Sequence, residues 1–284
     1  MARKPAVAGT FYDSDTSTLR RTVESLLKTR PPTGVQNAVG LVAPHAAYMY
    51  SGAVAGRAYA SIRVPDRVII LAPNHTGLGM KAAVGLDGPW DTPLGSVEVD
   101  HAFGRRLIQA SDELVEDELA HLEEHAVEVH LPFLQSVNPS VSIVPICLRT
   151  MSYALCESIG KELAGVLEGE ENRPLLIASS DMNHHEPQKV ATRKDRMALE
   201  RVAGLDPKGL YQVVVDHHVS MCGFVPTVIM MIAAKALGVR HAEIMSYTTS
   251  GDVNGDYSSV VGYAGVILAT GKPAVKPLNF ASLD

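Results

Sequence analysis

Short runs of apolar, largely β-branched residues alternate along the chain with segments whose apolar residues recur every three or four positions. The runs are typical of buried strands and cover residues 38–43, 67–72, 141–148, 175–178, 244–248 and 260–268. The periodic segments predict helices over residues 16–28, 51–62, 100–109, 124–135, 153–167, 189–202 and 223–237. Because strands and helices alternate, we expect an α/β fold in which helices flank a sheet.

The organisation of the chain indicates one domain that spans residues 1–284. No repeat and no linker-like stretch interrupts the pattern, and 46% of the residues are hydrophobic, which is enough for a substantial core. After Gly271, Pro273 and Pro277 occur without periodicity, and we expect an extended surface segment there.

Charge and cysteine content limit the classes of partner. The 25 Lys and Arg against 31 Asp and Glu give a net charge of −6, which argues against a nucleic-acid partner. The apolar stretch 225–237 is shorter than the roughly 20 residues of a membrane span, so we expect no membrane partner. No export signal is visible, and three cysteines favour a reducing compartment, so we predict a cytoplasmic protein.

Polar side chains follow three of the predicted strands. The runs GLVAPH and VIILAPNH end in His45 and His75, and LLIASSDMNH ends in Asp181 and His184. The carboxyl ends of strands in an open α/β sheet form the crevice where ligands bind. These four side chains are therefore expected to converge.

Taken singly, each of these histidines fits a hydrogen-bonded loop or core residue better than a ligand. As a set, imidazoles and a carboxylate suit Fe, Zn, Cu or Ni, so a metal site is the leading hypothesis. Cys222 precedes a long apolar helix, and the helix dipole there is expected to favour its thiolate, as a soft ligand or a nucleophile. Cys147 and Cys156 are interpreted as buried structural residues.

The segment HLEEHAVEVHLPFLQ carries a further group of polar residues. His121 and His125 are spaced i, i+4, and His125 and Glu128 are spaced i, i+3, so the side chains of each pair could share a helical face. The order is not that of H-E-x-x-H, and a solvated charged face explains it equally well. We assign His125 and Glu128 a supporting position behind the ligands.

Other active-site motifs find no support. The glycines after His75 lack the spacing of a P-loop or of a dinucleotide fingerprint. Ser179 and Ser180 lack the flanking glycines of a nucleophile elbow, which argues against a serine hydrolase.

Together the motifs resemble those of the Memo family, whose bacterial and archaeal members are called AmmeMemoRadiSam system protein B. The similarity rests on RKPAVAGTFY (3–12), APHAAYMYSG (43–52), APNHTGLG (72–79), WDTPLG (90–95), EEHAVEVHLPFLQ (123–135), SSDMNH (179–184) and MCG (221–223). Each motif alone is weak, but their order is specific and spans nearly the whole chain.

The resemblance implies a single-domain α/β fold with a central mixed, largely parallel sheet, similar to the catalytic subunit of class III extradiol ring-cleaving dioxygenases. It implies that His45, His75 and Cys222 are metal ligands, that Asp181 and His184 line the same pocket as catalytic groups, and that His125 lies close by. The metal expected is Fe(II), with Cu or Zn as alternatives. Because a cysteine replaces the carboxylate ligand of the dioxygenases, ring cleavage does not carry over directly.

Three functions compete at this stage. The first is a metal-dependent redox enzyme acting on an unidentified small molecule. The second is a non-catalytic module that binds a peptide or protein and works with an AMMECR-like protein and a radical SAM enzyme. The third is a zinc hydrolase that uses the same ligands with an activated water.

Overall fold

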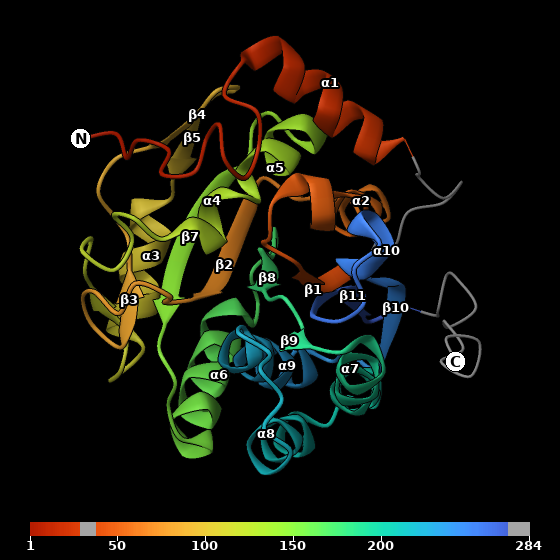
Figure 1. The fold of residues 1–284 in the computed structure, drawn as a ribbon. Helices are drawn as coiled ribbons and strands as arrows, with labels where there is room; N and C mark the ends of the chain where they lie inside the picture. The colour runs from red at the N-terminus through yellow and green to blue at the C-terminus, as the bar shows by residue number, and fades with distance from the viewer. Residues whose placement is uncertain (29–37, 272–284) are drawn as a thin grey trace.

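The computed structural model describes residues 1–28 and 38–271, and a mixed sheet lies at its centre (Figure 1). The strands are β1 (Ala38–Ala43), β2 (Arg67–Pro73), β3 (Ala82–Val84), β4 (Trp90–Thr92), β5 (Gly95–Val99), β6 (Val115–Glu116), β7 (Ser142–Leu148), β8 (Leu175–Ser179), β9 (His184–Glu186), β10 (His241–Thr249) and β11 (Val260–Ala269). The helices are α1 (Thr16–Leu27), α2 (Tyr48–Ala60), α3 (His101–Gln109), α4 (His125–Glu128), α5 (Leu131–Val137), α6 (Tyr153–Leu167), α7 (Gln188–Ala203), α8 (Pro207–Asp216), α9 (Phe224–Ala236) and α10 (Gly251–Asn254).

Within the described residues, the main path of the sheet runs β10-β11-β1-β8-β2-β7-β3-β6. The middle strands β1, β8, β2 and β7 are parallel to one another. The flanks are antiparallel, where β11 pairs with β1 and β10 on one side and β3 pairs with β7 on the other. The expected mixed α/β sheet is confirmed, and its parallel part is mainly the centre.

Helices cover both faces of this sheet. Gly40 of β1 lies against Met230 of α9, whereas Gly265 of β11 lies against Ala58 of α2. Leu268 pairs with Gly40 and is three positions from Gly265 along β11, so the two contacts lie on opposite faces of the sheet. In Figure 1, α6, α7, α8 and α9 gather on one side and α1, α2 and α5 on the other. The central strands are buried along nearly their whole length because both faces are covered.

Most predicted elements are present with small changes at their ends, but the helix expected over 124–135 is divided. It forms α4 and α5, separated by Val129 and His130. The hydroxyl of Tyr48 donates to the Val129 carbonyl at 2.6 Å, and Pro132 stands in the first turn of α5. Both features favour a break, because the carbonyl has an outside partner and the proline has no N–H to donate.

Some elements were not expected from the sequence, namely the short strands β3, β4, β5, β6 and β9 and the helices α8 and α10. The extended segment expected after Gly271 lies outside the described residues. Over residues 1–28 and 38–271, the structure contains no helix that is both long enough and apolar enough to cross a membrane.

Candidate metal centre

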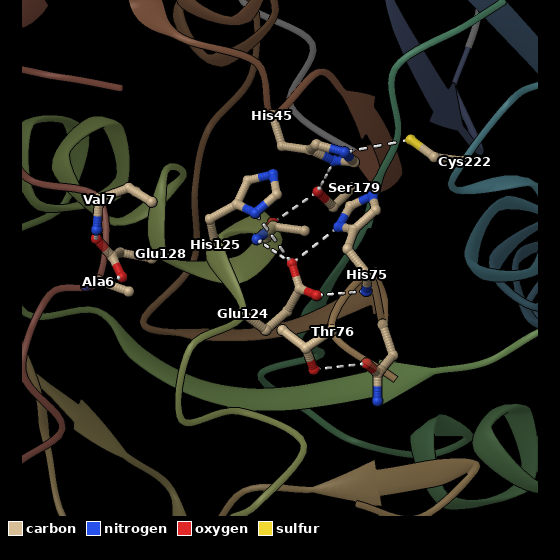
Figure 2. A network of polar contacts seen from close by, with 12 residues as sticks. Ala6, Val7, His45, His75, Thr76, Glu124, His125, Glu128, Ser179 and Cys222 are labelled. Atoms are coloured by element: carbon tan, nitrogen blue, oxygen red, sulfur yellow. Dashed lines mark hydrogen bonds and ion pairs between the residues drawn. The ribbon is translucent and has the colours of Figure 1, made fainter. Parts of the chain in front are cut away.

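The candidate site lies at the carboxyl ends of three adjacent parallel strands. His45, His75 and Asp181 each stand two residues after the last residue of β1, β2 and β8. Since β8 pairs with both β1 and β2, the three strand ends are neighbours. Figure 2 shows His45 and His75 close together, and Asp181 accepts a hydrogen bond from the His45 amide, so the expected convergence is confirmed for these three residues.

Three histidines form the core of the site. One donor atom from each of His45, His75 and His125 lies within 4.8 Å of the others, so among the described residues this group could hold a metal ion. The rings of His75 and His125 are stacked with centroids 4.8 Å apart, and the His45 ring meets each of them edge-on. His125, expected to support the ligands from behind, thus stands among the candidate donors at the start of α4.

Burial favours the neutral form of two of these imidazoles, those of His45 and His125. It places the pKa of His45 well below the usual value, and the nearby His75 and His125 rings add to this effect. Burial also lowers the pKa of His125. A neutral imidazole carries a lone pair on one ring nitrogen, which is the state that binds a metal ion.

Glu124 positions two of the histidines and was not predicted from the sequence. Its side chain is fully buried, with Oε1 2.9 Å from His75 Nδ1 and 3.4 Å from His125 Nδ1 (Figure 2). Burial alone would raise the pKa of Glu124, but hydrogen bonds from His75 and the Ala126 amide lower it overall. A carboxylate that accepts from Nδ1 directs Nε2 of a histidine toward a metal. The only sequence signal for this role is its place directly before His125.

Cys222 lies beside the histidine group. Its Sγ is 3.2 Å from His45 Nε2, and the Asp181 amide donates to the same sulfur at 3.3 Å. Burial, followed by the charge of Asp181, raises the pKa of this thiol. The protein alone therefore does not favour the expected thiolate, because desolvation outweighs the helix dipole. A coordinated cation would instead lower the pKa of the thiol. Cys147 and Cys156 are buried, as expected.

Asp181 contacts His45 through both carboxylate oxygens. The His45 amide donates to Oδ1 at 2.9 Å, and Oδ2 is 4.0 Å from His45 Nε2. Burial raises the pKa of Asp181 to about 7, although the amides of His45 and Ala46 oppose this shift. The carboxyl group can therefore gain or lose a proton near neutral pH.

His184 is tied to the loop that carries Cys222. Its amide donates to Ser220 Oγ at 2.7 Å, and its Nδ1 donates to the Ser220 carbonyl at 2.9 Å. Burial lowers the pKa of His184. The bond at Nδ1 favours the tautomer with an unprotonated Nε2, which is suited to accept a proton.

Glu128 lies apart from the histidine group. It accepts hydrogen bonds from Arg3 at 2.8 Å, from the amides of Ala6 and Val7, and from the Tyr12 hydroxyl. Figure 2 shows it beside Ala6 and Val7, turned away from the three histidines. Its direct contacts hold the amino-terminal segment against α4.

Comparison with known proteins places the chain in a family. Residues 3–267 match the model of the Memo-like protein family, so this chain belongs to that family. It is 42% identical to the MEMO1 family protein MK0963 of Methanopyrus kandleri over 95% of this chain and 100% of that protein. It is 39% identical to the MEMO1 family protein MTH_45 of Methanothermobacter thermautotrophicus over 93% of this chain and 99% of that protein. The resemblance inferred from the motifs is confirmed.

A solved structure shares the fold at much lower sequence similarity. It is that of the uncharacterized protein JW3007 from Escherichia coli K12, with a TM-score of 0.52 and 14% identity over 80% of this chain and 98% of that chain. At this identity the likeness shows the fold alone.

Proposed function

We propose that this Memo-family protein binds one divalent metal ion through His45, His75 and Cys222, with His125 in reach as a further donor. The observation that supports this most is the convergence of three imidazoles, two just beyond the ends of β1 and β2 and one at the start of α4. A buried carboxylate, Glu124, directs two of them. Such a pairing of ligand and carboxylate is typical of metal sites.

The spacing of the donors fits a shared ion. Two ligands at bond lengths of about 2.0 Å for nitrogen and about 2.3 Å for sulfur stand about 3.5 Å apart in a tetrahedral site. The 3.2 Å between His45 Nε2 and Cys222 Sγ is close to this separation. A hydrogen bond from the thiol to the imidazole occupies the same geometry in the metal-free protein.

The reaction we propose is metal-dependent oxidation or reduction of a small molecule, with Fe(II) as the metal. Nitrogen-rich sites with open positions suit non-haem iron, and when bound the metal would supply Lewis-acid and redox chemistry. Asp181, 4.0 Å from His45 Nε2, would hold a proton, and His184, whose Nδ1 bonds to the Ser220 carbonyl, would accept one at Nε2 from a bound molecule. Copper and zinc are the alternative metals.

Metal content after anaerobic reconstitution tests this proposal. Wild type loaded with Fe(II) should retain about one equivalent, and His45→Ala/Cys222→Ala should retain little. His217→Ala, which changes an exposed histidine, is the matched control. Unchanged binding in the double variant would refute the site, and binding of zinc with cleavage of ester probes would favour the hydrolase.

Cobalt substitution separates the two candidate third ligands. A Co(II)–thiolate bond gives a near-ultraviolet charge-transfer band, which Cys222→Ser should abolish and His125→Ala should retain. If the band is absent from wild type, Cys222 is not a ligand and the histidine group alone forms the site.

A second candidate function is binding of a partner protein beside the site. Four large apolar side chains on two loops are between 37% and 59% exposed, namely Leu78, Met80, Leu119 and Leu122. The loops touch, since the Met80 amide bonds to Asp117. Exposed apolar side chains gathered in this way are typical of interaction surfaces.

We propose an AMMECR-like protein or a radical SAM enzyme as the partner at these loops. Leu119→Ser/Leu122→Ser should weaken co-elution with the partner on gel filtration and leave metal content unchanged. Val253→Ser, at an exposed apolar residue elsewhere, is the matched control. If wild type and both variants co-elute with the partner equally, these loops are not the contact surface.

A further inference from the structure

Ser179, the last residue of β8, lies at the centre of a buried hydrogen-bond cluster behind His45. Its Oγ is 2.7 Å from His45 Nδ1, 2.8 Å from His130 Nε2 and 2.6 Å from the Ala126 carbonyl oxygen. The side chains of Ser179 and His130 are fully buried. Water is therefore not needed to complete any of these three contacts.

The number of protons in this cluster fixes their direction. A serine hydroxyl has one hydrogen to donate and two lone pairs that accept. A carbonyl oxygen can only accept, so the Ser179 hydrogen must go to Ala126. Both imidazoles must then donate to Ser179, His45 through Nδ1–H and His130 through Nε2–H. The reverse arrangement would bring two oxygens to 2.6 Å with no hydrogen between them.

The same reasoning extends one residue further. With its hydrogen on Nε2, neutral His130 has a lone pair on Nδ1, and the Tyr59 hydroxyl lies 2.9 Å from that nitrogen. Tyr59 therefore donates to His130. Burial supports these states because it lowers the pKa of His130 to about 3 and raises that of Tyr59 well above the usual value.

We propose that Ser179 is a positioning residue that holds His45 in the Nδ1–H tautomer, so that the lone pair of Nε2 faces Cys222 and the metal site. The inference deepens the proposed function and rests on it for its purpose, but the tautomer belongs to the protein without metal. His45 and His130 must have opposite tautomers because both donate to one hydroxyl through different nitrogens.

Long-range ¹H–¹⁵N correlation of the histidine rings tests this in the metal-free protein. Wild type should show a protonated Nδ1 and an unprotonated Nε2 for His45, and the opposite for His130. His45→Gln and His130→Gln assign the two signals. An Nε2–H tautomer for His45 in wild type would overturn the proposal without the need for any variant at Ser179.

Two variants separate positioning from packing. Ser179→Ala should turn both histidines into tautomer mixtures, whereas Tyr59→Phe should change His130 alone. Tyr59→Phe keeps the ring that stacks on Phe133. Ser61→Ala, at a buried serine that bonds to the Arg57 carbonyl, is the matched control and should change neither signal. Unchanged His45 signals in folded Ser179→Ala would refute the assignment.

Metal affinity distinguishes failure of this inference from failure of the proposed function. If the tautomer matters for binding, Ser179→Ala should bind Zn(II) about 10–100-fold more weakly than wild type. Wild type that shows the expected tautomers but binds no metal would refute the proposed function and leave the structural assignment intact. Equal Zn(II) affinity in both proteins would refute a positioning role for Ser179.

Discussion

Glu124 presents one carboxylate oxygen to two histidines of the candidate centre. The hydrogen bonds that it accepts from His75 and from the Ala126 amide stabilise its ionised form in a fully buried place. An ionised carboxylate accepts only, so it favours the Nδ1–H tautomer of His75 and leaves Nε2 for a ligand. A neutral amide cannot enforce this choice.

We expect Glu124→Gln to weaken metal binding about 10–100-fold, because a neutral amide oxygen accepts more weakly from His75 Nδ1, and the NH₂ in the place of Oε2 meets the His75 backbone N–H. Zn(II) competition against a chromophoric chelator measures the change. Far-ultraviolet circular dichroism should stay close to wild type, since the amide retains a carbonyl oxygen for the Ala126 amide.

Glu123→Gln is the matched control for this prediction, since it removes a neighbouring charge from an exposed side chain. If both variants lose affinity equally, the effect of Glu124 is one of net charge. If neither loses affinity, Glu124 does not position a ligand.

At the scale of elements, the start of α9 comes very close to the end of β8. A side chain at Gly223 would collide with the Ser179 carbonyl and with the Ser180 side chain. This close approach lets Cys222, the preceding residue, lie 3.2 Å from His45. The contact therefore needs a glycine for lack of space, not for an unusual backbone conformation.

Gly223→Ala should lower the free energy of unfolding by about 1–3 kcal/mol, as overpacking in a tight contact does. It should also reduce metal affinity, because α9 must move away from β8 and take Cys222 with it. Urea unfolding and Zn(II) titration measure the two effects. Gly165→Ala on α6, where a methyl group meets open space, should instead stabilise by about 0.5–1 kcal/mol. Wild-type behaviour of Gly223→Ala would contradict the steric argument.

The amino-terminal segment is held to α4 by a buried ion pair. The side chains of Arg3 and Glu128 are 8% and 0% exposed. Glu128→Gln leaves the Arg3 charge without a partner and should cost about 3–5 kcal/mol of unfolding free energy. Urea unfolding measures this loss, and faster proteolysis within residues 1–12 would accompany it.

The Lys4–Asp91 pair provides a control on the same segment, because Lys4 is 80% exposed there. Asp91→Asn should cost no more than about 1 kcal/mol. Equal losses in Glu128→Gln and Asp91→Asn would show that burial of the Arg3 pair does not matter.

The strands that position the site could be predicted because β1, β2 and β8 are continuous apolar runs. A residue of the candidate site, His45, His75 or Asp181, stands two positions beyond each of these strands. The short strands β3 to β6 could not be found, since two to five residues are too few to establish a period. The break between α4 and α5 depends on the Tyr48 hydroxyl, which is distant in sequence.

Only the part of the candidate site that follows the strands could be predicted from the sequence. His45 and His75 follow strands and are visible in the sequence, but the placement of His125 among the donors depends on how α4 packs against β2. Glu124 and Ser179 act through contacts with residues 49 and 134 positions away in the chain. Such contacts follow from the strand order β1-β8-β2, which the residue pattern does not specify.

At the scale of the whole molecule, buried titratable groups link stability to pH in opposite directions. Burial lowers the pKa of His121 to about 4 and that of His130 to about 3, so the unfolded chain binds two more protons there than the folded protein near pH 5. Burial raises the pKa of Asp195 to about 7, so at that group the folded protein binds one more. For these three groups the balance is one proton in favour of the unfolded chain, and the lowered pKa of His45 and the raised pKa of Asp181 act in opposite directions to one another.

We therefore expect the free energy of unfolding to rise with pH between about 4.5 and 6 by about 1.4 kcal/mol per pH unit for these three groups. The stability contributed by the two neutral histidines is fully present above pH 6.5 and is lost as the pH falls toward 4. The stability contributed by the protonated Asp195 carboxyl is fully present below pH 4 and is lost as the pH rises through 7. Urea unfolding at a series of pH values measures the slope.

Asp195→Asn isolates the opposing part, because an amide mimics the protonated carboxyl toward the Asn183 amide and the Tyr247 hydroxyl. Wild type must ionise this fully buried group between pH 5 and pH 8, and the variant need not. Between pH 5 and pH 8 the free energy of unfolding of the variant should therefore rise by on the order of 3 kcal/mol relative to that of wild type. Asp216→Asn, at an exposed aspartate, should gain nothing. If both variants follow wild type, the Asp195 carboxyl is already ionised at pH 5, and the balance of protons must be set by other groups.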